Sequence, residues 1–210
     1  MGGYCTVVLS GHRCGSSAVA GALHKMGVPM GRHLMGRSPA NPGGHFEDQE
    51  FVGLHKRMLP DWRNPVVDLG VVTTEYMALL EKRGKLPSWG VKDPRMAFIF
   101  PLFRAFYHGK IRIVRMCRAT EASAASMEAR ARQANNDRLN VGGRGLEIAA
   151  AYETAIRAIL ANWHGPALFV QYNRLVDRPR ETVAMIAEFA GVEPTDEAIN
   201  FINPDLRHFP

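Results

Sequence analysis

The feature that most constrains the fold is an alternation of short apolar segments with helical patterns. Four segments have the length and the apolar or β-branched composition of buried strands: residues 5–9, 89–92, 111–117 and 167–171. A helical stretch follows each of them. A buried strand followed by a helix is the unit of parallel sheets. The sequence therefore predicts an α/β fold with a central parallel β-sheet flanked by helices.

Helical patterns between these segments support the same architecture. Residues 16–26 read as a helix that is closed by Gly27. A further helix is expected over residues 48–59. Between residues 145 and 164, apolar side chains recur at steps of three and four, which marks the buried face of a long helix: Ile148, Tyr152, Ala155, Ile159 and Trp163.

The size and composition of the chain suit one compact domain. It has 210 residues, of which 46% are hydrophobic and 22% charged, so a substantial core is expected. No run approaches the ~18–20 consecutive apolar residues that a membrane span needs. The first residues enter a strand-like segment without the basic start and cleavage site of a signal peptide. We therefore expect a single domain over residues 1–210, in the cytoplasm and without a membrane span.

The formal charge of +6 favours anionic partners, among which nucleic acid, acidic membrane and a phosphorylated nucleotide all qualify. The basic residues are dispersed and form no run of five, which argues against a nucleic-acid partner. Cys5, Cys14 and Cys117 lie in no CxxC arrangement, so free thiols are expected and a zinc site is not. We also interpret His12, His24 and His33 as exposed or turn residues, because no carboxylate is spaced to complete a metal site.

The most informative segment is residues 10–17, SGHRCGSS, between the first strand and the first helix. A turn of small residues there lets backbone N–H groups converge on an anion at the positive end of the helix dipole. Arg13 adds a permanent cation, and Ser16 and Ser17 add hydroxyl donors. The alternative is an ordinary strand-to-helix turn, in which Gly and Ser are also common.

The segment is not one of the common phosphate-binding motifs. Gly11 and Gly15 enclose only three residues and no Lys follows Gly15, so the Walker A pattern is absent. The glycine spacing of dinucleotide-binding loops is absent too. These two differences weaken the kinase and dehydrogenase interpretations.

The loop resembles the 5'-phosphosulfate loop of the sulfotransferase family. Members of that family carry Lys or Arg, then a small residue, Gly and two small hydroxyl residues. The matching positions here are Arg13, Cys14, Gly15, Ser16 and Ser17. In the family, an Arg at a strand end and a Ser eight residues later bind the 3'-phosphate. Arg118 and Ser126 match them, and a Ser about two helical turns beyond the Arg can approach the same phosphate.

Four more segments extend the resemblance over nearly the whole chain. WGVKDPR at residues 89–95 resembles a segment frequent in bacterial members, and VQYNRLVDRP at 170–179 resembles a Tyr-Glu-Asp-Leu segment. NPGGHFED at 41–48 and FINPDLR at 201–207 also resemble bacterial sulfotransferases. The chain departs from the family in Cys14, where Ser is commoner, in Asn173, where an acid is usual, and in lacking a glycine-rich basic segment over the 3'-phosphate.

The resemblance identifies the chain as similar to a small bacterial-type sulfotransferase that uses 3'-phosphoadenosine 5'-phosphosulfate (PAPS). It implies a P-loop-type fold like that of nucleoside triphosphate hydrolases. It also implies PAPS as co-substrate, adenosine 3',5'-bisphosphate (PAP) as product, and a small-molecule or glycan acceptor. Tyr172 corresponds to a Tyr beside the adenine, although packing at a strand end is an equal alternative.

Transfer of a sulfuryl group is an in-line displacement, in which positioning and charge stabilisation carry most of the catalysis. Arg13 and Lys92 are the candidates for the cation at the bridging oxygen, and no metal is required. Glu47 is the favoured base for the acceptor, with Asp48, His45 and Asp93 as substitutes. The alternative for Glu47 is a capping charge at a helix start, and that for Lys92 is a surface salt bridge to Asp93 or a neighbour.

Two further functions stay open: a small-molecule or nucleotide kinase with an atypical phosphate loop, and a non-catalytic module that binds PAP. The acceptor and the oligomeric state are not defined by the sequence. Two irregular stretches, residues 28–44 and 133–145, are candidates for lids or binding segments.

Overall fold

The computed structural model describes residues 4–38, 41–68, 70, 73–134 and 141–202, and in them a four-stranded sheet has the order β2-β1-β3-β4. All three strand pairs are parallel. The strands are β1 (Tyr4–Leu9), β2 (Trp89–Lys92), β3 (Lys110–Cys117) and β4 (Ala167–Gln171). The predicted parallel sheet is therefore confirmed, and the bounds of β2 and β4 are those expected from the sequence.

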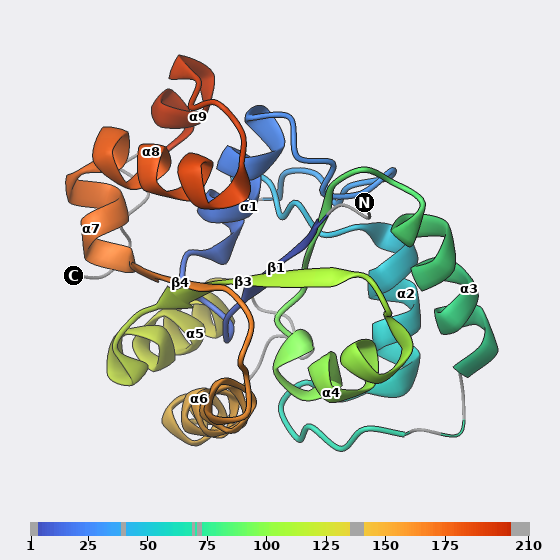
Figure 1. Cartoon of the computed structure of the whole chain (residues 1–210). Helices are drawn as coiled ribbons and strands as arrows, with labels where there is room; N and C mark the ends of the chain where they lie inside the picture. Colours follow the sequence, from blue (N-terminus) through green and yellow to red (C-terminus); the bar gives the residue numbers. More distant parts are fainter. Residues whose placement is uncertain (1–3, 39–40, 69, 71–72, 135–140, 203–210) are drawn as a thin grey trace.

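Helices cover both faces of the sheet (Figure 1). One face carries α1 (Ser16–Lys25), α8 (Pro179–Ala190) and α9 (Asp196–Phe201), and the opposite face carries α4 (Met96–Phe106), α5 (Thr120–Ala134) and α6 (Gly145–Ala161). Beside β2 lie α2 (Gln49–Met58) and α3 (Thr73–Gly84), while α7 (Tyr172–Asp177) follows β4 directly.

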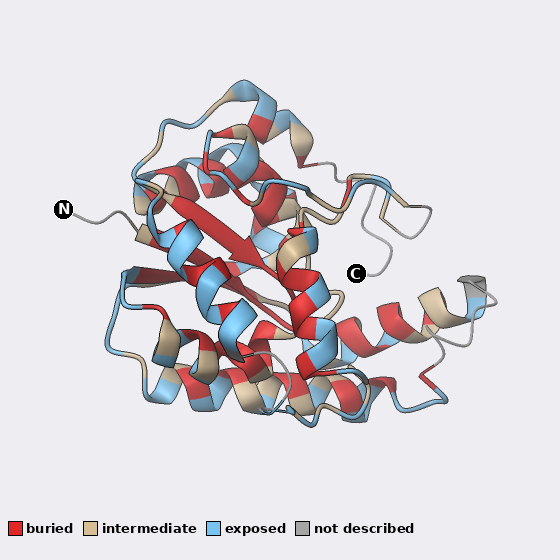
Figure 2. Ribbon diagram, turned by 90° about the vertical axis from the view of Figure 1, so that its right-hand side faces the viewer, coloured by how far each residue is buried: buried red, intermediate tan, exposed pale blue. Residues whose placement is uncertain are grey.

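The central strand supplies side chains to two separate cores. Cys5, Val7 and Leu9 of β1 belong to the core beneath α2, α4 and α6, whereas Val8 belongs to the core beneath α1 and α8. This division follows from the alternation of side chains along a strand that is covered on both faces. In Figure 2 the strands are accordingly buried along most of their length, while the helices have one buried and one exposed side.

The carboxyl ends of all four strands lie at the same edge of the sheet. Because the strands are parallel, the segments that follow them meet at the same edge: residues 10–17 after β1, Asp93 after β2, Arg118 after β3 and Tyr172 after β4. The chain continues from β1 to β2 on one side and later places β3 on the other side of β1. In open α/β sheets, ligands bind in the crevice that such a reversal creates.

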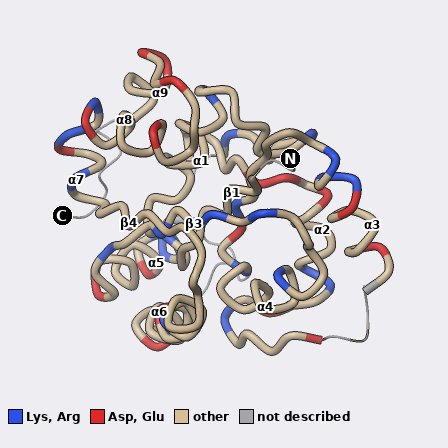
Figure 3. The backbone as a smooth tube through the Cα atoms, in the orientation of Figure 1, with Lys and Arg blue, Asp and Glu red and all other residues tan. Residues whose placement is uncertain are grey.

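Basic residues are spread over many elements (Figure 3). Within the described part of the chain, no helix is long and apolar enough to cross a membrane. The segment 28–38 is irregular, as expected, whereas α5 extends to Ala134 into the stretch expected to be a loop. Residues 39–40, 135–140 and 203–207 of the segments discussed above lie outside the described residues.

A buried hydrogen bond joins α2 to the residue that follows β2. The Asp93 carboxylate accepts a hydrogen bond of 2.9 Å from His55 Nδ1, and both side chains are fully buried. Arg95 donates to the same carboxylate through its backbone N–H and its guanidinium. Burial opposes ionisation of Asp93, but the hydrogen bond and charge of His55, together with Arg95, outweigh it and hold its pKa well below the usual range. The pair fixes the position of the residue that follows Lys92.

Asp93→Asn is expected to lower the free energy of unfolding by about 3 kcal/mol at neutral pH, because it removes the buried carboxylate to which His55 and Arg95 donate. The folded-state pKa of Asp93 is depressed, so its contribution is present above the unfolded-state pKa of about 3.9 and is lost as the pH falls further. The difference in the free energy of unfolding between wild type and Asp93→Asn should therefore become smaller below about pH 4. Urea denaturation at several pH values measures it, with the exposed Glu193→Gln as control. A difference that stays constant down to pH 3 would contradict this role.

Candidate active site

A pocket opens at the carboxyl edge of the sheet, with about 1060 Å³ of open space counted out to its mouth. Of the site residues predicted from the sequence, nine line it and Cys14 does not. The nine are Arg13, Gly15, Ser16, Ser17, Glu47, Lys92, Arg118, Ser126 and Tyr172.

The loop after β1 presents the first amides of α1 to this pocket. Gly15, the N-cap, has φ 86°, and Arg13 has φ 60°, so the backbone passes twice through the left-handed region before the helix begins. In the part of the chain that is described, no side chain caps this helix and its first turn contains no acid. Such a helix start offers N–H donors and a positive dipole end to an anion.

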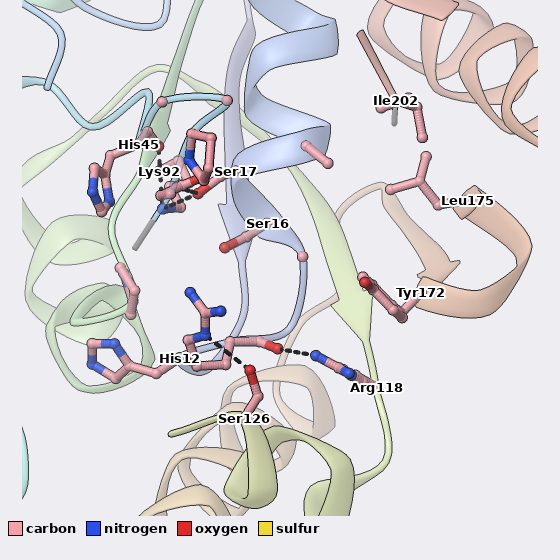
Figure 4. Close-up of a pocket in the computed structure, with 18 of the residues that line it drawn as sticks. His12, Ser16, Ser17, His45, Lys92, Arg118, Ser126, Tyr172, Leu175 and Ile202 are labelled. Carbon is pink, nitrogen blue, oxygen red and sulfur yellow. Dashed lines mark hydrogen bonds between the residues drawn. The ribbon is translucent and has the colours of Figure 1, made fainter. Parts of the chain in front are cut away.

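Lys92 organises one polar end of the pocket (Figure 4). Its ammonium donates to Glu47 Oε1 at 2.6 Å, to Ser17 Oγ at 3.2 Å and to the His45 carbonyl at 3.3 Å. Asn41 donates to the same Ser17 hydroxyl at 3.0 Å. Lys92 and Glu47 are both buried, so the sequence alternative of a surface salt bridge for Lys92 is wrong.

Among the described residues that line the pocket, Glu47 is the one carboxylate. The two other acids considered as bases are committed to different partners. Asp48 caps α2 by accepting from the Glu50 N–H at 3.1 Å and also pairs with Arg83. Asp93 is held by His55 and Arg95, as described above. The capping role that was the alternative for Glu47 thus belongs to its neighbour Asp48.

Arg118 and Ser126 lie at the second polar end of the pocket (Figure 4). Arg13 bonds to both of them. Arg13 Nε donates to Ser126 Oγ at 3.0 Å, and Arg118 Nη1 donates to the Arg13 carbonyl at 2.8 Å. Burial, together with the positive charges of Arg130 and Arg118, lowers the pKa of Arg13 to about 10. The Arg13 side chain thus bonds to Ser126 at the end of the pocket that contains Arg118. The resemblance to the sulfotransferase loop had implied a contact with the phosphosulfate instead.

An apolar wall closes the pocket next to Arg118. The Arg118 guanidinium carbon lies 4.3 Å from the centre of the Tyr172 ring, a cation–π contact. The remaining apolar lining on this side comes from α7, α9 and the residue after α9: Leu175, Val176, Phe201 and Ile202. A flat aromatic base could pack against such a surface.

The Cys14 side chain points away from the pocket. It is buried, and its Sγ lies 3.4 Å from Ser123 Oγ and within hydrogen-bonding distance of the His12 carbonyl. Burial raises the pKa of this thiol, so it stays protonated. Any contribution of Cys14 to anion binding must come from its backbone N–H.

Three further polar side chains in the lining were not identified as site residues from the sequence: His12, Asn41 and Arg130. His12 is a turn residue, as expected, but its ring is enclosed between Trp62, with centroids 4.4 Å apart, and Tyr152. Burial, with the charge of Arg95, lowers its pKa to about 3, so it is neutral. The position of His12 within residues 10–17 was the feature of the sequence that could have identified it as a lining residue. His24 and His33 are exposed, as predicted, and the described residues contain no group of metal-ligating side chains.

Solved structures with a similar fold are sulfotransferases. The sulfotransferase domain of the olefin synthase from Synechococcus PCC 7002 is 20% identical, with a TM-score of 0.56 over 94% of this chain and 76% of that chain. A sulfotransferase from Mycobacterium tuberculosis H37Rv is 15% identical, with a TM-score of 0.58 over 96% and 71%. The sulfotransferase domain of the curacin biosynthetic pathway is 15% identical, with a TM-score of 0.57 over 94% and 77%.

These likenesses show that the chain has the sulfotransferase fold, and they confirm the fold class inferred from its motifs. No model of a protein family matches the chain. No curated protein matches it either.

Gly15→Ala tests the packing of the loop. A Cβ on Gly15 would lie 2.6 Å from Tyr172 Cδ2, whereas one on Gly143, which has φ 74°, would meet no atom within 4 Å. Both substitutions carry the left-handed backbone cost of about 1–2 kcal/mol. We expect Gly15→Ala to cost roughly 1–3 kcal/mol more in the free energy of unfolding, since it also overpacks the site. Urea denaturation should show this excess disappear in a Tyr172→Ala background, and equal losses for the two variants would contradict the packing.

Proposed function

We propose that the chain is a sulfotransferase whose residues 1–210 form one domain and move a sulfuryl group from PAPS to a hydroxyl or amine of a small acceptor. The supporting observation is a single pocket at the carboxyl edge of a sulfotransferase fold that has two polar ends. One contains Lys92 and Ser17, and the other contains Arg118 and Ser126. An adenosine with phosphates at both its 5' and 3' positions has two anionic groups that suit these ends.

The 5'-phosphosulfate is proposed to bind where α1 begins. The first amides of α1, the hydroxyls of Ser16 and Ser17, and the Lys92 ammonium converge there. The 3'-phosphate is assigned to Arg118 and Ser126, since Arg118 supplies a planar charged donor and Ser126 a hydroxyl. Tyr172 and the apolar wall then provide the surface for the adenine.

Glu47 is proposed as the base that takes the acceptor proton. As the acceptor oxygen or nitrogen forms its bond to sulfur, the bond from sulfur to the bridging oxygen breaks, and PAP leaves with the electron pair. The negative charge that grows on the bridging oxygen is stabilised by a cation, for which Lys92 is placed near Ser17. Arg13 is the second candidate, and it would have to exchange its contact with Ser126 for the donor.

This assignment explains why Lys92 and Glu47 share a buried ion pair. Lys92 donates to the carboxylate and holds Glu47 at the pocket wall. A bound phosphosulfate attracts the same ammonium, and any weakening of the pair leaves the carboxylate oxygens available to accept a hydrogen bond from an acceptor. The donor therefore prepares the base by its own charge.

Arg118→Ala is expected to weaken the binding of PAP at least about tenfold more than that of adenosine 5'-phosphate, because only PAP carries the 3'-phosphate. Isothermal titration calorimetry with both nucleotides measures the two losses. Arg174→Gln, which removes an exposed Arg from α7 outside the pocket lining, is the control and should change neither affinity. Equal losses for both nucleotides would remove the 3'-phosphate role of Arg118.

Glu47→Gln is expected to lower turnover by about 10²–10⁴, the usual contribution of a general base, and to leave nucleotide affinity within a few fold. Gln keeps an acceptor oxygen for Lys92, so the site should stay assembled. Turnover is measured as transfer from labelled PAPS to a cell extract, with mass analysis of the product. Glu50→Gln, in the first turn of α2 and outside the pocket lining, should retain activity. Wild-type rates in Glu47→Gln would place the base elsewhere.

The two alternative functions make different predictions in the same experiments. A kinase would transfer label from ATP, and a non-catalytic PAP-binding module would bind PAP without turnover on any acceptor. The loop without a Lys after Gly15 argues against the kinase. The presence of Glu47 beside Lys92 argues against the non-catalytic module. The cytoplasmic location, the small-molecule or glycan acceptor and the absence of a nucleic-acid partner remain predictions from the sequence.

A further inference from the structure

Arg130 is a cation in the pocket to which the sequence motifs assign no role. It lies on α5, four residues and about one turn after Ser126, so both side chains are on the same face of the helix. Its Nε is buried, and among the described residues the guanidinium has no hydrogen-bond or ion-pair partner. A buried guanidinium N–H without an acceptor is costly. An acceptor supplied by a ligand would satisfy this N–H.

The unpaired Nε of Arg130 differs from the two similar atoms elsewhere. Arg83 and Arg95 also have a buried Nε without a partner, but each of them pairs with a carboxylate through another nitrogen. Arg130 has no such pair among the described residues, and it lines the same pocket as Glu47. Its charge is therefore available to a ligand.

Arg130 interacts electrostatically with residues at both polar ends of the pocket. Burial lowers its pKa, and the negative charge of Glu47 raises it again. Its own positive charge helps to lower the pKa of Arg13, after burial, and that of His45, after burial and the charge of Lys92. Arg130 thus acts on the base at one end and on the loop cation at the other. This is the region where the sulfur atom must lie if Glu47 is to reach an acceptor in line with the leaving oxygen.

The charges of the pocket favour the donor over an acidic acceptor as the partner of Arg130. Among the described lining residues, the permanent or ammonium cations are Arg13, Lys92, Arg118 and Arg130, and the carboxylate is Glu47. Their sum is +3. PAPS carries roughly four negative charges at neutral pH, because a phosphate monoester contributes nearly two and the phosphosulfate adds two. The donor alone exceeds the positive charge, so no cation is left over for an anionic group on the acceptor.

We infer that Arg130 is a further catalytic residue, which binds the non-bridging oxygens of the sulfuryl group while it moves from the nucleotide to the acceptor. This inference rests on the proposed function. Three equatorial oxygens carry negative charge in the transition state of such a transfer, and the planar fork of a guanidinium can contact two of them. Lys92 then stabilises the leaving oxygen, and Arg130 stabilises the group that moves.

Nucleotide pairs isolate this role without knowledge of the acceptor. Adenosine 5'-phosphosulfate differs from adenosine 5'-phosphate by the sulfuryl group alone, and PAP differs from adenosine 5'-phosphate by the 3'-phosphate alone. In calorimetry, Arg130→Gln should reduce the preference for the phosphosulfate over the 5'-phosphate by about ten- to hundredfold, the value of a charge-assisted contact. The preference for PAP over adenosine 5'-phosphate should stay within about twofold.

The control is Arg132→Gln, which removes an exposed Arg from the same helix and should alter neither preference. Arg130→Lys retains a charge in case Arg130→Gln does not fold, and it should lose part of the phosphosulfate preference because an ammonium lacks the fork. A changed PAP preference would instead assign Arg130 to the 3'-phosphate, and two unchanged preferences would exclude it from the donor site. If wild type bound none of these nucleotides, the proposed function itself would fail.

Discussion

The contact on which the site depends is the buried ion pair between Lys92 and Glu47. Two charges withdrawn from water are costly unless each is neutralised, and here each neutralises the other at 2.6 Å. Lys92 ends β2, and Glu47 precedes the cap of α2, so the pair also joins the sheet to the first helix beside it. The neighbouring pair of Asp93 with His55 repeats this connection one residue further on. Together they hold the proposed base and the proposed cation on a strand and on the segment that leads into a helix.

Much of the fold was accessible from the sequence because its signals are local. β-branched and apolar runs predict the strands, and the recurring apolar positions from Ile148 to Ile159 predict α6. The site was accessible in outline for a different reason. Arg118 and the loop before α1 each follow a strand, and parallel strands bring the segments after them to one edge whatever the details of packing.

The partners of individual side chains could not be predicted, because they depend on backbone conformation and on long-range packing. Arg13 bonds to Ser126 across 113 positions of sequence, after a backbone step through the left-handed region. Adjacency in the sequence favours a salt bridge between Lys92 and Asp93. In the structure Lys92 pairs with Glu47 and Asp93 pairs with His55 instead. Arg130 belongs to no motif in the sequence. Its place in the pocket follows from its position on the same face of α5 as Ser126.

The close approach of Gly15 to Tyr172 has a mechanical consequence. The ring of Tyr172 occupies the space where any other residue at position 15 would have a Cβ, and Arg118 lies on this ring as well. The turn at the start of α1 and the surface assigned to the adenine therefore cannot shift independently. A nucleotide that displaces the ring must also move the amides that face its phosphate. Such mechanical coupling would allow the two halves of the cleft to recognise their ligand in concert.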